Sequence, residues 1–259
     1  MGVKRKNKNY ISSIFLIFFT IIFLFSSIKV AKWLKENKDR NDLINELQET
    51  ITIDNEKDDI ERFSVDFNGL KEKNPDTIAW IKVNGTNIEY PVVKTNDNDF
   101  YLNRSFDKSY NSGGWVFMDY KNIGDGSDKN VVIYGHNRRD GGIFGTLKNI
   151  LTKEWQNNDE NNIISFISEN KKEEYQVFSV YKIEKEDYYI TTSFNTDTEF
   201  NEYLDKIKTR SNKDFGIDVS TDDDILTLST CANNNNYRVV LHAKKLINKW
   251  HIYYSQLNI

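Results

Sequence analysis

The chain of 259 residues has one cysteine, two prolines and three histidines, and these scarcities limit what it can be. A single cysteine excludes a scaffold held together by disulfides. The length suggests one or two domains, and the sequence has no internal repeat and no Pro-rich or Ser-rich linker. Aromatic residues make up 14% of the chain, so it can bury enough apolar surface to fold rather than stay disordered.

Charge is distributed unevenly along the chain. Residues 1–32 contain six basic side chains and no acidic one. With six of the 35 basic residues and none of the 39 acidic residues in that segment, the other 227 residues carry a formal charge of −10. An acidic body has little affinity for a phosphate backbone, which argues against nucleic acid as a partner.

One apolar run is long enough to cross a membrane. Residues 11–28 carry no charge, and a helix of that length extends about 27 Å, close to the roughly 30 Å of a hydrocarbon core. Basic residues before the run favour a cytoplasmic N-terminus. A cleaved signal peptide is the alternative, but no convincing small-x-small cleavage site follows. We expect a basic cytoplasmic tail over 1–10, a transmembrane signal-anchor over 11–28, a helical stalk over 29–62 and a catalytic β domain over 63–259.

Short strand-like runs dominate the rest of the chain. They cover 78–83, 88–93, 114–118, 130–134, 162–167, 175–183, 188–192, 225–230 and 237–247. Asn84-Gly85 between the first two predicts a hairpin, because both turn positions can take positive φ. Since regular helices do not separate the runs, a parallel βαβ sheet is disfavoured. A mainly β fold, a closed barrel or a sandwich of eight or nine strands, is favoured.

Three helical patterns interrupt or precede the strands. A Thr196 to Glu199 capping box followed by apolar residues at helical spacing predicts an amphipathic helix inserted at 197–210. A shorter helix is predicted over 143–151. The stalk should be helical as well, since its apolar residues Leu43, Ile44, Leu47 and Ile51 recur at the same spacing.

The lone cysteine and one of the histidines each stand where a strand meets a polar loop. Cys231 closes the run ILTLSTC just before an Asn-rich loop, and His136 closes VVIYGH in the same way. A lone cysteine is commonly a small buried hydrophobe, and a lone histidine is commonly structural. A strand end beside a solvated loop can instead hold a nucleophile rigid yet reachable.

Three further residues compete for roles at such a site. Arg238 opens the last strand and could hold an oxyanion or a substrate carbonyl by charge-assisted hydrogen bonds, although an arginine there is usually a solvated charge. His242 and His251 are the competing bases, of which His242 lies inside the final strand. The acidic residues Asp125, Asp128, Asp222, Asp223 and Asp224 are interpreted as solvated loops, so we expect no metal and no cofactor.

The chain resembles a class B sortase, a membrane-anchored cysteine transpeptidase of Gram-positive bacteria, over about residues 60–259 plus the span. The resemblance rests on Tyr134-Gly135-His136-Asn137, on Thr227-Leu228-Ser229-Thr230-Cys231 and on the following Arg238. It implies a closed sortase-type β-barrel of about eight strands with N-terminal helices and the inserted helix near 197–210. Two departures from the family are a short loop from Cys231 to Arg238 and Ala232 at a position where some members have an acid.

The resemblance also implies roles. The nucleophile falls on Cys231, the acid/base on His136 and the oxyanion or substrate-stabilising arginine on Arg238. Substrate-groove positions fall on Leu102, Tyr189, Ile190, Ser229 and Asn98. The implied reaction cleaves the C-terminal sorting motif of a surface protein after Thr and passes the acyl group to an amine of a peptidoglycan precursor, or to a pilin Lys. The implied location is the cell membrane, single-pass, with the catalytic domain outside.

Three rival functions fit parts of the pattern. Papain-like or amidase-like cell-wall hydrolases place the histidine after the cysteine, which would favour His242. L,D-transpeptidases place the histidine first, but resemble Ser-His-Gly-Cys, and no glycine precedes Cys231. A non-catalytic, membrane-tethered β domain with Cys231 buried is the third.

Overall fold

The computed structural model describes residues 6–54, 63–124, 128–184, 186–231 and 236–246, and for residues 6–9 and 231 the description covers the backbone. The chain divides into two compact units, residues 1–46 and 47–259. Ala232, Asp125 and His251, which the sequence singled out, lie outside the described residues.

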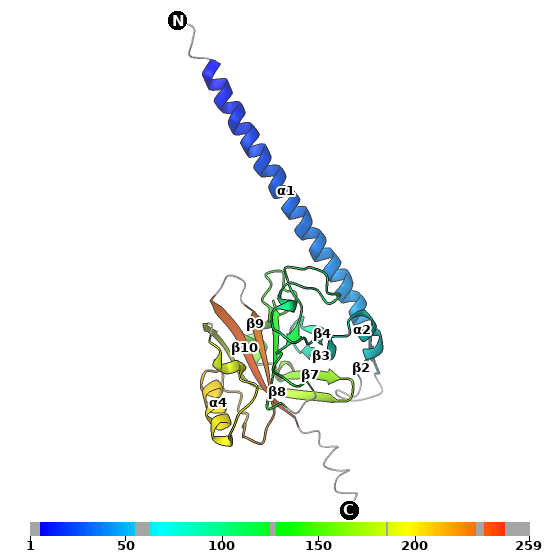
Figure 1. The fold of residues 1–259 in the computed structure, drawn as a ribbon. Coiled ribbons are helices and arrows are strands. Elements are labelled where there is room, and N and C mark those ends of the chain that lie inside the picture. The colour runs from blue at the N-terminus through cyan, green and yellow to red at the C-terminus, as the bar shows by residue number, and fades with distance from the viewer. Residues whose placement is uncertain (1–5, 55–62, 125–127, 185, 232–235, 247–259) are drawn as a thin grey trace, which may run out of the picture. The chain divides into compact units, whose positions relative to one another are not determined.

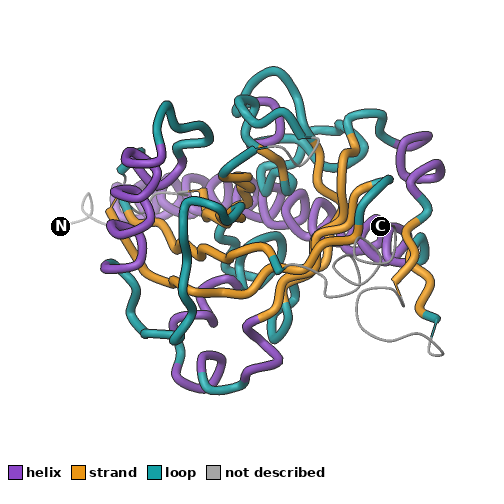
Figure 2. The backbone as a smooth tube through the Cα atoms, turned by 90° about the horizontal axis from the view of Figure 1, so that it is seen from below, coloured by secondary structure: helices purple, strands orange, loops and turns teal. Residues whose placement is uncertain are grey.

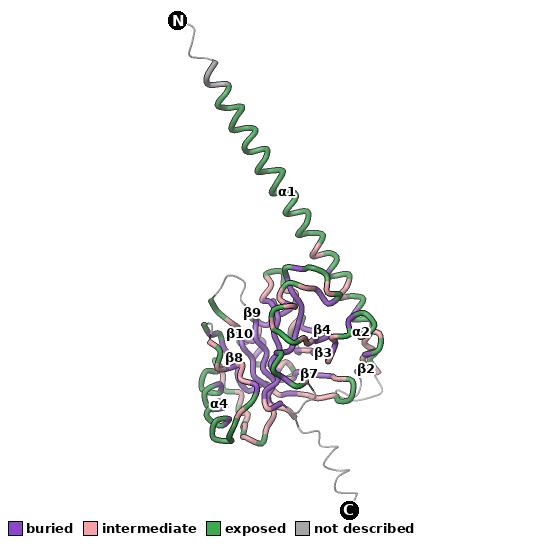
Figure 3. The backbone as a smooth tube through the Cα atoms, viewed as in Figure 1, coloured by how far each residue is buried: buried purple, intermediate pink, exposed green. Residues whose placement is uncertain are grey.

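A single long helix, α1 (Lys6–Gln48), makes up the described part of the N-terminal unit. Its residues 10–35 are exposed (Figure 3). The segment Tyr10–Gln48 contains a window with mean hydropathy 2.5, long and apolar enough to cross a membrane, a property shared with signal sequences. The boundaries between tail, span and stalk stay a prediction.

The helix ends earlier than the apolar spacing predicted. The Thr50 amide and hydroxyl both donate to the Leu47 carbonyl oxygen, which closes the chain into a turn after Gln48. The β-branched run that follows favours an extended backbone. Ile51, expected on the helix, therefore lies in β1 (Ile51–Ile53), paired with β2 (Phe63–Val65) in a two-stranded sheet.

Eight strands form a closed barrel in the order β10-β8-β7-β3-β4-β5-β6-β9, which confirms the predicted mainly β barrel. They lie side by side as a curved sheet (Figure 1; Figure 2). Their bounds are β3 Thr77–Val83, β4 Glu89–Val93, β5 Phe117–Met118, β6 Asn130–His136, β7 Ile163–Ser168, β8 Lys172–Glu184, β9 Ile225–Cys231 and β10 Tyr237–Lys245. The pairs β4–β5 and β6–β9 are parallel, and the other neighbours are antiparallel.

Short helices connect the strands. They are α2 Phe67–Lys73, η2 Phe100–Leu102, η3 Leu147–Leu151, α3 Lys153–Gln156, η4 Asp159–Asn162, η5 Tyr188–Ile190 and α4 Asp197–Thr209, where η marks a 3₁₀-helix. The predicted helix α4 is confirmed, and its apolar stripe is buried. The Thr196 hydroxyl caps the Glu199 amide, but the Glu199 carboxylate accepts from the Asn195 amide instead of closing the capping box on Thr196.

Two local predictions were wrong, because the apolar residues in these runs are apolar since they are buried and not since they belong to a regular strand or helix. The run 188–192 was expected as a strand, but η5 occupies its start, since a closed barrel offers no free edge for another strand. The helix expected from 143 starts only at Leu147, because Ile143 has φ +55°, outside the helical region.

Two shorter features also differ from expectation. At the predicted hairpin, the Val83 amide bonds the Ile88 carbonyl around a loop in which Gly85, and not Asn84, takes positive φ. The run 114–118 is a strand only over β5, because Gly114 has φ +59° and turns the chain before it.

Candidate active site

The ends of β6 and β9 bring His136 and Cys231 together, although 95 residues separate them in the sequence. The two strands are adjacent and parallel, and their register runs from Asn130 opposite Ile225 to His136 opposite Cys231. Every residue of β6 is buried, as expected for an apolar strand inside a closed barrel. Adjacent strands lie about 4.8 Å apart, so the two residues stand one strand spacing apart at the same rim.

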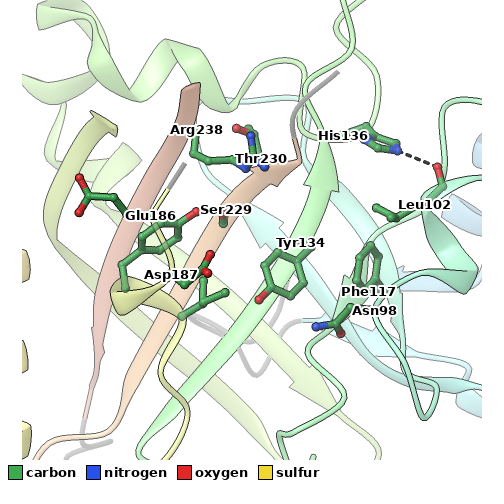
Figure 4. Close-up of a pocket in the computed structure, with 12 residues that line it drawn as sticks. Asn98, Leu102, Phe117, Tyr134, His136, Glu186, Asp187, Ser229, Thr230 and Arg238 are labelled. Carbon is green, nitrogen blue, oxygen red and sulfur yellow. Dashed lines mark hydrogen bonds between the residues drawn. The ribbon is translucent and has the colours of Figure 1, made fainter. Parts of the chain in front are cut away.

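The imidazole of His136 is held by one hydrogen bond. Its Nε2 lies 2.7 Å from the Leu102 carbonyl oxygen, so Nε2 carries the proton and donates (Figure 4). The ring is buried, and Nδ1 has no hydrogen-bond partner among the described residues. Burial lowers the pKa of His136; the bond to Leu102 opposes this, while the positive charges of Arg138 and Arg238 lower it further. The ring therefore favours the neutral form with a free Nδ1 lone pair.

Arg238 enters the site from the start of β10. It pairs with Ile183 of β8 and lies two residues before Val240, which begins the β9–β10 ladder opposite Ser229. The Thr230 hydroxyl accepts from the Val239 amide at 2.9 Å and fastens this end of β10 to β9. The guanidinium Nη1 is buried and has no partner within the described part of the chain. It is a donor available to a bound oxygen.

A cavity of about 260 Å³ lies between these residues. Its lining comprises Asn98, Leu102, Phe117, Tyr134, His136, Glu186, Asp187, Tyr189, Ile190, Ser229, Thr230 and Arg238. All five groove positions that the resemblance implied are in this lining, and so are two of the three residues implied for catalysis. Figure 4 shows all of them as sticks and labels most; they come from β5, β6, β9, β10 and from the short helices and loops that connect the strands.

Sequence reasoning did not predict five of the residues that line this cavity. Tyr134 and Thr230 stood within the quoted motifs, so their positions beside His136 and Cys231 were the available signal. Phe117 lay in a predicted strand but carried no polar group to mark it. No sequence pattern distinguishes Glu186 and Asp187 from other acidic loop residues.

A buried carboxylate, that of Asp119, joins two residues of the cavity lining through hydrogen bonds. Asp119 accepts from the Asn98 amide at 3.0 Å and from the Tyr134 hydroxyl at 2.7 Å, through the same oxygen. The Asn98 side-chain oxygen in turn accepts from the Tyr120 amide. Asn98 therefore has polar partners on both sides of its amide and fixes the loop it belongs to.

His242, the competing base, lies inside the barrel wall and not in the cavity lining. It is fully buried, with Nδ1 2.8 Å from the Thr227 hydroxyl and Nε2 2.7 Å from the Tyr181 hydroxyl. Burial lowers the pKa of His242 to about 3. With both nitrogens engaged and the charged form disfavoured, His242 is a poor candidate for a general base.

This lowered pKa predicts a pH-dependent stability. The unfolded chain takes up a proton at His242 near pH 6.5, whereas the folded protein does so only near pH 3. Stability due to this group is thus complete above about pH 6.5 and is lost as pH falls, by at most about 1.4 kcal/mol per pH unit.

Urea unfolding of a chain beginning at Lys32 measures this loss. His242→Gln should flatten the dependence between about pH 6 and pH 4, while His136 titrates in both proteins and cancels. Equal slopes in the two proteins would contradict the assignment.

Three of the five acidic residues that the sequence singled out have local structural roles. The Asp128 carboxylate accepts from the Ile123 and Gly124 amides and closes its own loop. Asp223 pairs with Lys244 and Asp224 with Lys129. Within the described ranges, no three His, Cys, Asp or Glu side chains gather as a metal site.

Comparison with known proteins identifies the family. The family model for the Sortase domain matches residues 81–246. Sortase B of Listeria monocytogenes is 33% identical over 227 residues, which cover 86% of this chain and 92% of that protein. The chain therefore belongs to the sortase family, and its relatives place it in class B.

Two solved structures extend the likeness to three dimensions. The Staphylococcus aureus sortase B-substrate complex has a TM-score of 0.66 at 30% identity and covers 85% of this chain and 97% of that chain. A sortase B complexed with triglycine has a TM-score of 0.66 at 34% identity and covers 70% of this chain and 85% of that chain. Sortases are cysteine transpeptidases that process and anchor surface proteins, and the chain has this activity.

Proposed function

We propose that the chain cleaves the C-terminal sorting motif of surface proteins after Thr, and that Cys231, His136 and Arg238 carry out the reaction. The observation that carries this proposal is the register of β6 on β9, which sets His136 opposite Cys231. The cavity beside them has Arg238 in its lining and gives room for an extended peptide; Nη1 of that arginine has no partner among the described residues.

In the first half of the reaction the Cys231 thiolate attacks the Thr carbonyl carbon. The carbonyl oxygen becomes an oxyanion, and Arg238 stabilises it by donating from Nη1. His136, as imidazolium, donates a proton from Nδ1 to the departing amine, because Nε2 is already committed to the Leu102 carbonyl. The C–N bond breaks, the C-terminal fragment leaves with its new amine, and the part of the substrate that ends in Thr remains on Cys231 as a thioester.

The second half releases the acyl group to an amine. A peptidoglycan-precursor amine, or a pilin Lys, attacks the thioester carbonyl while neutral His136 accepts the amine proton, which restores the free thiolate. The two solved relatives, one a substrate complex and the other a triglycine complex, support a peptide donor and an amine acceptor.

The catalytic protonation state is a minority population. With ordinary pKa values of about 8.5 for the thiol and 6.5 for the imidazole, roughly 1% of sites hold thiolate and imidazolium together at neutral pH. The lowered pKa of His136 reduces this fraction further, unless the thiolate stabilises the imidazolium. Slow turnover is the expected consequence.

We also propose that α1 anchors the enzyme in the cell membrane in a single pass, with the catalytic domain outside. The apolar segment of α1 and the membership of a cell-surface enzyme family support this location. The anchor should not take part in the chemistry, because every cavity-lining residue belongs to the second compact unit.

A chain beginning at Lys32 should accordingly stay soluble and cleave a sorting peptide at the same rate as the full-length protein. Peptide cleavage by the two proteins, the longer one in detergent, measures this. Activity confined to the full-length protein in lipid would mean that the anchor does more than tether.

The proposed reaction is tested with a panel of sorting peptides, each incubated with and without amine acceptors. Mass spectrometry should detect a thioester adduct on the protein for the preferred peptide, and a ligated product when the matching amine is present. Cleavage that leaves no adduct and never transfers to an amine would favour the amidase-like hydrolase instead.

A further inference from the structure

We infer that Tyr203 and Asn130 are positioning residues that hold the η5 wall of the peptide cavity, an inference that rests on the proposed function. The Tyr203 hydroxyl donates to the Tyr189 carbonyl oxygen at 3.1 Å. The Asn130 amide donates to the Thr191 carbonyl oxygen at 2.8 Å and to the Tyr203 hydroxyl at 2.9 Å. These bonds hold the backbone on both sides of Ile190, which lines the cavity together with Tyr189.

The η5 wall depends on these side chains because its own backbone bonds are long. The Ile190 and Thr191 amides reach the Asp187 and Tyr188 carbonyl oxygens at 3.3 and 3.4 Å. Such distances exceed the usual range of a strong amide bond, and a single 3₁₀ turn has poor hydrogen-bond geometry. The segment also lies outside the barrel ladder, since β8 ends at Glu184.

The two positioning residues belong to a longer buried chain of hydrogen bonds. The Thr227 hydroxyl donates to the Asn130 side-chain oxygen at 2.7 Å and, having spent its hydrogen, accepts from His242 Nδ1 at 2.8 Å. His242 Nε2 then accepts from the Tyr181 hydroxyl at 2.7 Å. Every donor points the same way, from β8 through β10, β9 and β6 to α4 and η5.

This direction is fixed by the chemistry of the groups. Asn130 must present its oxygen to Thr227, because its amide nitrogen already serves two acceptors. Thr227 can then only accept from His242, which requires a neutral ring protonated on Nδ1. Reversing one of these hydrogen bonds would leave a buried donor facing another donor. The hydrogen-bond network therefore keeps each of its side chains in one orientation. It therefore transmits the geometry of the rigid barrel wall to η5.

One face of the cavity is completed by this arrangement. The Tyr189 hydroxyl lies 3.1 Å from the Ser229 hydroxyl, which links η5 to β9 beside Cys231. If η5 shifts, the groove walls at Tyr189 and Ile190 move, whereas His136 and Arg238 stay on their strands. Breaking this series of hydrogen bonds should thus weaken peptide binding more than it slows the chemical step.

Tyr203→Phe is the direct test, because it removes one hydroxyl and keeps a ring that packs on Phe194 and Phe200. The matched control is Tyr175→Phe, which removes another buried tyrosine hydroxyl, bound to Glu173, outside the cavity lining. The full-length proteins are compared in detergent for KM and kcat with the preferred sorting peptide, for acyl-enzyme formation and for the alkylation rate of Cys231.

We expect Tyr203→Phe to raise KM for the peptide about five- to tenfold, with unchanged kcat and unchanged thiol alkylation. Tyr175→Phe should leave all of these at the parent values. Thr227→Val, which breaks the chain farther from η5, should raise KM in the same sense, and Thr227→Ser, which keeps the hydroxyl, should restore it. This pair keeps the inference testable if Tyr203→Phe does not fold.

Three outcomes would overturn a claim, one of them the proposed function and two of them the positioning role. A parent protein that never forms an acyl-enzyme with any sorting peptide would remove the proposed function, whatever the variants do. A parent protein that acylates and turns over, together with folded Tyr203→Phe and Thr227→Val proteins of unchanged KM, would remove only the positioning role. A fall in both kcat and the rate of Cys231 alkylation in these variants would also overturn the positioning role, since the substitutions would then have disturbed the catalytic centre.

Discussion

Replacing Cys231 with alanine is expected to abolish both peptide cleavage and the covalent acyl-enzyme, because no other thiol exists in the chain. His136→Ala should leave a folded protein whose thiol still reacts with an alkylating agent. Its turnover should fall by about 100-fold to 10,000-fold, since the departing amine then lacks a positioned acid. Intact-protein mass spectrometry after mixing with a sorting peptide, alongside steady-state rates, measures both effects.

His242→Gln is the matched control for the histidine. It removes an imidazole that lies in the barrel wall, outside the cavity lining, so it should lower stability more than the chemical rate at saturating peptide. An acyl adduct on the Cys231→Ala protein, or full turnover by His136→Ala, would contradict the assignment. Loss of the chemical step in a folded His242→Gln protein would restore the amidase-like mechanism.

Arg238→Lys should also cause a large loss, even though the charge is kept. A guanidinium offers several fixed donors, whereas an ammonium is a compact point charge on a flexible stem. Loss of one donor to a developing oxyanion raises a barrier by about 2.7 to 4 kcal/mol. The donor in question is the buried Nη1 of Arg238, which has no partner in the described part of the chain, and kcat for peptide cleavage is the quantity to measure.

Arg138→Lys provides a comparison on the same side of the barrel. Arg138 also places a positive charge near His136, but its guanidinium is bound to Asp140 and it does not line the cavity. Its lysine variant should keep most of the activity. Near-normal turnover by Arg238→Lys would show that charge alone suffices at that position.

The sequence revealed the barrel and the strand ends because both depend on local patterns. Apolar runs such as VVIYGH and ILTLSTC indicate buried strands, and the change from apolar to polar residues marks where His136 and Cys231 leave them. The sequence motifs and the family resemblance then supplied the pairing of these two ends. The helix α4 was equally predictable, since its cap and its apolar stripe lie within 15 residues of each other.

Features that depend on distant parts of the chain could not be predicted. Within the run 188–192, Tyr189 is buried in a cluster with residues of α4 and the barrel. That the run forms no strand follows only from closure of the barrel, which leaves no free edge for it. The link between Thr227 and Asn130 spans 97 positions, so no spacing rule points to it. Glu186 and Asp187 line the cavity only because η5 turns beside Ser229.

The parallel pairing of β6 with β9 has a consequence for how this enzyme can vary. The segment 137–224, with two strands and α4, connects the two strands. The length of this segment does not set the distance between His136 and Cys231, because the lateral register of the two strands does. Insertions that leave η5 and α4 in place should therefore be tolerated. A two-residue slip between the strands would displace His136 by about 6.6 Å. Sequence change in such an enzyme should thus be least tolerated in these two seven-residue strands, and it should be better tolerated in those parts of 137–224 that neither line the cavity nor hold η5.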